Sequence, residues 1–90
     1  MRTLAYTECA HTVATIERNN GFMQILFNGT PNAYLSMTAA NSDFKDMLAM
    51  AHIALVTGKT VVLRYAANGV TCGSNAEQNR TDLIGMTVCQ

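Results

Sequence analysis

The chain has 90 residues, of which 49% are hydrophobic and only 13% are charged, and its formal net charge is zero. This length allows a single domain, residues 1–90, and leaves no room for a second core. A typical soluble protein carries about 25% charged residues, so the low charge indicates that part of the surface is buried in an assembly. The balanced charge argues against nucleic acid as a partner, because phosphate binding requires a basic surface.

The sequence contains no apolar run of about 18 residues, so we expect no membrane insertion. Its first residues lack the apolar segment of a signal peptide, which leaves a mature secreted form or a cytoplasmic protein. Cys9, Cys72 and Cys89 are the three cysteines, and their spacing fits no metal-binding motif. They allow one disulfide with one odd thiol, or three free thiols. Because the sequence contains no metal-binding motif, we expect neither a metal nor another cofactor.

The first part of the chain predicts three strands joined by tight turns. Residues 10–18 are rich in β-branched side chains and are followed by Asn20-Gly21, which favours a turn. Residues 22–28 form the second predicted strand, and a turn at its end leads to the third strand at 32–38. Together these segments predict an antiparallel meander.

Residues 42–58 predict the one helix. Ser42 is a favourable N-cap, and Gly58 can adopt the left-handed conformation that closes a helix. At 100° per residue a core-facing stripe is predicted, consisting of Phe44, Met47, Leu48, Ala51 and Leu55.

The opposite face of the predicted helix is also largely apolar. It carries Met50 and Ile53, with Thr57 near its end. We expect these three residues to form an oligomer interface, because a helix facing solvent normally carries charged residues there. The alternative is that a loop of the same chain covers this face.

The remaining chain adds a strand at 59–67, a polar loop at 68–79 and a last strand at 81–89. The predicted order is β-β-β-α-β-β. A mainly β domain with one helix between its third and fourth strands is typical of an OB-like five-stranded barrel.

The sequence offers few residues for catalysis. His11 and His52 are the only histidines, and the local sequence indicates no Ser-His-Asp or Cys-His arrangement. His11 opens the first predicted strand beside Thr12, where it could contact a ligand or lie in solvent at the strand end. We therefore predict a binding or assembly module that is not an enzyme.

Two segments resemble the B subunits of AB5-type bacterial toxins. FKDMLAMAHIALVTGKTVVLRY, at 44–65, is similar to the segment of the typhoid and subtilase toxin B subunits in which a helix ends in Thr-Gly and continues into a strand. LIGMTVC, at 83–89, is similar to the ending of those subunits and of the pertussis toxin B components. The opening at 9–17 is similar to cholera toxin's B subunit. The resemblance covers about residues 9–89.

The resemblance implies an OB domain that closes into a pentameric ring, binds cell-surface glycans and carries a toxic A subunit. A bridge from Cys9 is implied, with Cys72 or Cys89 as its partner, and we expect the pair Cys9 and Cys89. Tyr6 or Tyr34 would offer a surface for stacking on a sugar. The positions that match the family's sugar pocket are His11, Thr12, Asn28, Thr30 and Asn32.

The expected function is that of a secreted, non-catalytic virulence protein: a glycan-binding ring that delivers an A subunit. The alternative is a cytoplasmic OB-like oligomer that acts as a scaffold or binds a protein partner without binding sugar.

Overall fold

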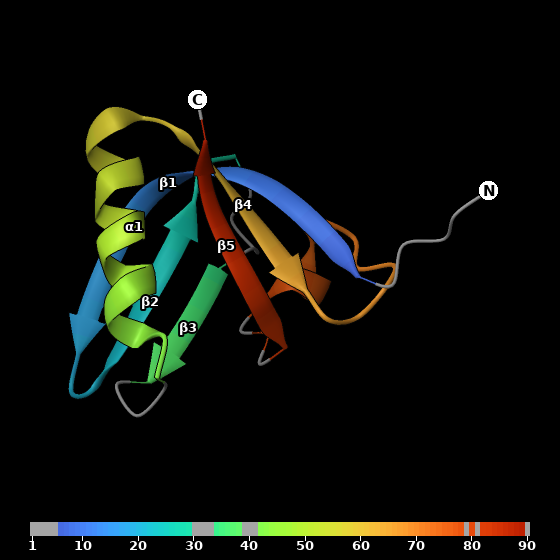
Figure 1. Ribbon diagram of the computed structural model, residues 1–90, viewed down its shortest axis with the longest axis horizontal. Coiled ribbons are helices and arrows are strands. Elements are labelled where there is room, and N and C mark those ends of the chain that lie inside the picture. Colours follow the sequence, from blue (N-terminus) through green and yellow to red (C-terminus); the bar gives the residue numbers. More distant parts are fainter. Residues whose placement is uncertain (1–5, 30–33, 39–41, 79, 81, 90) are drawn as a thin grey trace.

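The computed structural model describes residues 6–29, 34–38, 42–78, 80 and 82–89 (Figure 1). The predicted order β-β-β-α-β-β is confirmed, with one short 3-10 helix added inside the predicted polar loop. The elements are β1 (Thr7–Asn19), β2 (Phe22–Phe27), β3 (Tyr34–Thr38), α1 (Phe44–Thr57), β4 (Thr60–Tyr65), η1 (Asn75–Glu77) and β5 (Leu83–Cys89).

The strands form one antiparallel sheet in the order β3-β2-β1-β4-β5. β1 is thirteen residues long and belongs to both halves of this sheet. Its first half pairs with β4 and its second half pairs with β2. The register to β2 shifts between Val13 and Thr15, and a bulge of this kind bends a strand. β1 accordingly curves across the whole molecule (Figure 1).

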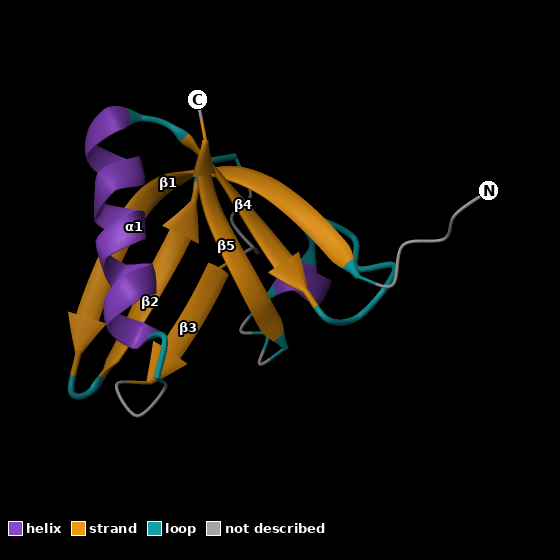
Figure 2. Ribbon diagram, in the orientation of Figure 1, coloured by secondary structure: helices purple, strands orange, loops and turns teal. Residues whose placement is uncertain are grey.

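Within the described residues the sheet is open, because no pairing joins its edge strands β3 and β5. The domain is therefore a mainly β fold built on a strongly bent sheet. α1 lies along one side of this sheet, whereas η1 lies near the C-terminal end of β4 (Figure 2). Among the described residues, no helix combines the length and the apolar character needed to cross a bilayer.

The core consists of the inward positions of three strands and one stripe of α1. Side chains alternate between the two faces of a strand, so every second residue is buried in β2, in β4 and in β1 from Cys9 to Val13. The buried apolar residues are Cys9, Val13, Met23, Ile25, Phe27, Phe44, Met47, Ala51, Ala54, Val61, Leu63 and Tyr65.

The inner stripe of α1 is narrower than the sequence predicts. Ala54 is fully buried, whereas Leu55, predicted to face the core, is 38% exposed. Leu48 is only partly buried. Two small alanines, Ala51 and Ala54, lie in the buried stripe at 1% and 0% exposure, and Leu55 lies at its edge.

The two helix ends differ in how well they were predicted. The N-cap is Asp43, one residue after the predicted Ser42. Gly58 closes the helix as predicted, with φ of 70° and an N–H that donates to the Ala54 carbonyl at 2.9 Å.

We expect Ala54→Leu to lower the free energy of unfolding by about 1–3 kcal/mol, because the added atoms must fit between α1 and a closely packed sheet. Ala49→Leu makes the same change at an exposed position of the same helix and should stay within about 0.5 kcal/mol of the parent. Urea denaturation followed by circular dichroism measures both. Equal effects of the two substitutions would contradict the packing described for Ala54.

Candidate functional site

Thr12 and Asn28, two of the predicted sugar-contacting residues, lie together at the bend of β1. The Asn28 backbone N–H donates to the Thr12 carbonyl at 2.9 Å. The Asn28 side-chain amide donates to Thr12 Oγ1 at 2.9 Å and to the Val13 carbonyl at 3.4 Å. Asn28 is exposed and Thr12 is half-buried, so the pair is accessible from solvent.

These contacts determine which hydrogen bonds the pair can still make. Thr12 Oγ1 accepts from Asn28, and among the described residues no acceptor is recorded for its own O–H proton. The Asn28 amide donates its N–H groups within the chain, and within the described residues its Oδ1 is recorded with no donor and can accept a further hydrogen bond. A donor and an acceptor held side by side on a rigid strand end suit a pair of neighbouring hydroxyl groups on a ligand.

The other predicted sugar-contacting residues do not join this surface in the described structure. Thr30 and Asn32 lie outside the described residues, as does the side chain of Tyr34. Tyr6 is half-buried and lies under the Arg64 guanidinium, 4.4 Å from the ring centre. Arg64 also pairs with Glu8 at 2.9 Å on the exposed surface.

The prediction that His11 lines the same surface as Thr12 is wrong. Neighbouring residues of a strand point to opposite faces, so Thr12 faces outward while His11 faces the core. His11 is only 8% exposed, and its ring stacks on Phe27 with the ring centres 4.5 Å apart. It is a core residue with a polar partner.

That partner is Glu77, the most deeply buried charged residue of the described chain, at 1% exposure. Its carboxylate contacts His11 Nε2 at 2.7 and 2.9 Å. It also accepts from the Tyr65 hydroxyl at 2.7 Å and from the Gly73 backbone N–H at 2.8 Å. The donors come from β1, β4 and the loop before η1, so one side chain connects three separate segments.

Burial and hydrogen bonding act in opposite directions on the Glu77 pKa. Burial alone would raise it, because a carboxylate loses its hydration. The hydrogen bonds from His11, the Gly73 N–H and Tyr65 outweigh this effect and lower the pKa below the ordinary 4.5. The same arrangement raises the pKa of Tyr65, through burial first and then through its hydrogen bond to Glu77. Glu77 is therefore ionised and Tyr65 is protonated at neutral pH.

Glu77 was not predicted from the sequence, which places it in a polar loop. The available signal was the spacing Ser74-x-x-Glu77, typical of a helix start. Ser74 does cap η1, since its Oγ accepts from the Ala76 N–H at 3.2 Å. The Glu77 side chain bonds to the N–H of Gly73 rather than of Ser74, and it points into the core.

A disulfide lies next to this carboxylate, and it joins Cys9 to Cys72, the alternative partner, rather than to Cys89, the expected one. Cys9 pairs with Cys72, with the sulfur atoms 2.00 Å apart and the Cα atoms 5.5 Å apart, while Cys89 is free. The predicted Cys9–Cys89 pair is wrong because β4 lies between β1 and β5. Residues two strands apart are separated by about 10 Å, which is beyond the reach of a disulfide.

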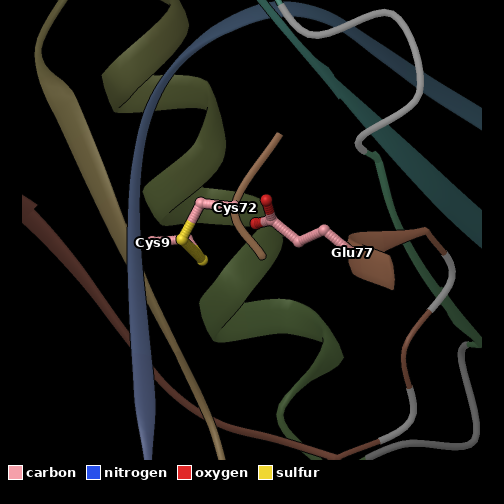
Figure 3. A group of neighbouring side chains, drawn as sticks. All are labelled: Cys9, Cys72 and Glu77. Carbon is pink, nitrogen blue, oxygen red and sulfur yellow. A yellow bond between two sulfur atoms is a disulfide. The ribbon is translucent and has the colours of Figure 1, made fainter. Parts of the chain in front are cut away.

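The two sulfur atoms and the Glu77 carboxylate form one compact group. Their potential ligand atoms all lie within 4.8 Å of one another. The Glu77 carboxylate points toward Cys72, and Cys9 reaches the same point from β1 (Figure 3). Cys9 is buried, whereas Cys72 is exposed.

The predicted oligomer interface lies on the outer face of α1. Ile53 is 54% exposed and Met50 is half-buried. The Thr57 hydroxyl is satisfied within the helix, donating to the Ile53 carbonyl at 2.6 Å. Val56, which was not predicted for this face, is 83% exposed. We call Met50, Ile53 and Val56 the outer stripe.

Comparison with known proteins adds no relative, because the chain matches no protein-family model and no curated protein. Any function must therefore be argued from the geometry of the chain itself.

We expect the free energy of unfolding to fall as the pH drops below about 4.5. Because the folded-state pKa of Glu77 is lowered, its contribution is fully present above the ordinary value and is lost as pH falls through the folded value. The pKa of Asp82 is lowered to about 2, mainly by its hydrogen bonds with Arg80, so its contribution to the free energy of unfolding is also lost as the pH falls. Urea denaturation between pH 7 and pH 3 measures the curve.

Glu77→Gln separates the contribution of Glu77 from that of Asp82. At pH 7 this variant should be less stable by about 1–3 kcal/mol, because an amide cannot accept all the hydrogen bonds that the buried carboxylate receives from His11, Tyr65 and the Gly73 N–H. Its stability should also depend less steeply on pH below 4.5 than that of the parent. Glu17→Gln removes an exposed carboxylate and serves as the matched control. A Glu77→Gln curve parallel to the parent's would contradict the role given to Glu77.

Proposed function

We propose that this chain is a non-catalytic, glycan-binding domain of the toxin B-subunit type, with an OB-like fold that assembles into a ring, as a pentamer. The exposed outer stripe of α1 is the observation that carries this proposal. Each exposed apolar residue that a neighbouring copy covers contributes favourable burial at about 25 cal/mol per Å². Such a ring would serve to deliver an A subunit.

The strand order supports an OB-like fold. OB folds are five-stranded, partly open Greek-key barrels. A long first strand shared between two halves, with the helix between β3 and β4, is compatible with that architecture. In the proposed fold, β3 and β5 approach each other to close the barrel.

The Cys9–Cys72 disulfide supports secretion, because disulfides persist mainly in oxidising compartments. A cytoplasmic OB-like scaffold that binds a protein partner remains the second candidate. The outer stripe is the observation that favours this scaffold, because an exposed apolar surface can bind another protein as well as a second copy of this chain.

We expect Ile53→Asp to dissociate the ring while leaving the fold intact, because Ile53 is 54% exposed within the single chain. Size-exclusion chromatography with light scattering should give a pentamer for the parent and a monomer for the variant, with matching circular dichroism spectra. Lys45→Asp changes another exposed residue of α1 and is the control that should remain assembled. A parent protein that is monomeric at micromolar concentration would remove the ring from the proposal.

We expect a glycan array to identify a ligand, and Thr12→Val to weaken binding to that ligand about tenfold by removing one hydrogen bond. Thr15→Val makes the same change at an exposed position beyond the bulge and should bind like the parent. An assembled ring that binds no glycan would favour the scaffold instead. Equal binding by the parent and both variants would place the sugar elsewhere.

A further inference from the structure

The group formed by Cys9, Cys72 and Glu77 has a property that neither a structural disulfide nor a glycan surface requires. A buried carboxylate is held within 4.8 Å of both sulfur atoms. In the oxidised chain this carboxylate faces a neutral disulfide. If the disulfide is opened, the same place holds two thiols and one carboxylate, which is a set of ligands for a metal ion.

We propose that reduction of the Cys9–Cys72 disulfide converts this group into a binding site for a thiophilic divalent cation such as Zn²⁺, with both thiolates and the Glu77 carboxylate as ligands. A dithiol reductant supplies two electrons and two protons and becomes a disulfide itself. The S–S bond breaks and two thiols form. Binding of the cation then releases both thiol protons to solvent as two sulfur–metal bonds form.

The geometry suits such an ion. Zn²⁺ binds thiolate sulfur at about 2.3 Å and carboxylate oxygen at about 2.1 Å, in tetrahedral sites. Two sulfur atoms on one tetrahedral Zn²⁺ are therefore about 3.8 Å apart. The Cys9 and Cys72 Cα atoms, 5.5 Å apart, allow the sulfur atoms to separate to this distance by rotating their side chains. A water molecule would occupy the fourth position.

The surroundings of Glu77 already resemble the outer shell of a metal site. Ligating carboxylates are usually oriented by hydrogen bonds from neighbouring groups. Tyr65, His11 and the Gly73 N–H orient this one, each within 2.9 Å. The exposure of Cys72 gives the cation a path from solvent, while buried Cys9 closes the inner side.

Charge balance favours occupation by a cation. Two thiolates beside an ionised carboxylate would carry three negative charges. Among the described residues, His11 is the one basic side chain that contacts Glu77, and the nearby Arg80 is engaged with Asp82 at 2.7 Å. A divalent cation would neutralise most of this charge.

The test uses the Cys89→Ser chain, in which the third thiol is absent, reduced by a phosphine that does not compete for metal. Co²⁺ serves as the spectroscopic probe. One equivalent per chain should give thiolate-to-cobalt charge-transfer bands and the visible bands of tetrahedral cobalt, and Zn²⁺ should displace them. Zn²⁺ should also raise the Tm of the reduced chain. The same protein with its disulfide intact is the matched control and should show neither effect.

Two further variants identify the ligands. Cys72→Ser, at an exposed position, should lose the cobalt bands while keeping the circular dichroism of the reduced parent. Glu77→Gln, if folded, should bind Co²⁺ at least tenfold more weakly. The proposal is overturned if the reduced protein binds no more Co²⁺ than the oxidised protein. It is also overturned if Cys72→Ser or folded Glu77→Gln binds as tightly as the parent, or if Zn²⁺ leaves the Tm of the reduced chain unchanged.

Discussion

The buried Glu77 carboxylate is the interaction on which the arrangement of the chain depends. A charged group removed from water is tolerated only when donors replace its hydration, and here the donors come from β1, β4 and the loop before η1. The disulfide fastens the same loop to β1 through Cys72. Farther along, the Asp82 carboxylate accepts from the Ala67 N–H at 2.9 Å and ties the two ends of the segment together. The described residues of the long connection from β4 to β5 are thus held against the domain at several points.

The bend of β1 gives the second constraint, because it determines which residues face outward. β1 passes from its pairing with β4 to its pairing with β2 close to Thr12, and Asn28 follows the end of β2 at the same place. Alternation along β1 then sends Thr12 to the surface and His11 into the core, toward Glu77. The polar surface and the buried carboxylate are therefore two sides of the same short stretch of strand, and a change of register in β1 would disturb both.

The parts of the structure that could be predicted are those encoded by neighbouring residues. Turn signals such as Asn20-Gly21 and the helix end at Gly58 place the strands and α1 correctly, because each depends on local backbone preferences. The face of His11 was also open to prediction, since strand alternation opposes it to Thr12. The partner of Cys9 and the burial of Glu77 were not, because their contacts join residues more than 60 positions apart. From its composition the loop at 68–79 is predicted to be polar, and the burial of the Glu77 carboxylate is seen only in the folded chain.

The fixed position of the loop also bears on the outer stripe of α1. The sequence allows either a loop of this chain or another molecule to cover Ile53. The segment from β4 to β5 is held beside the start of β1 by Cys72 and Glu77, on the far side of the molecule from α1 (Figure 1). To reach the outer stripe it would have to break the disulfide and expose the carboxylate. The described residues of this long loop therefore do not cover the outer stripe, where Val56 is 83% exposed. If a neighbouring copy covered the outer stripe, as proposed, it would remove this apolar surface from water without disturbing the core.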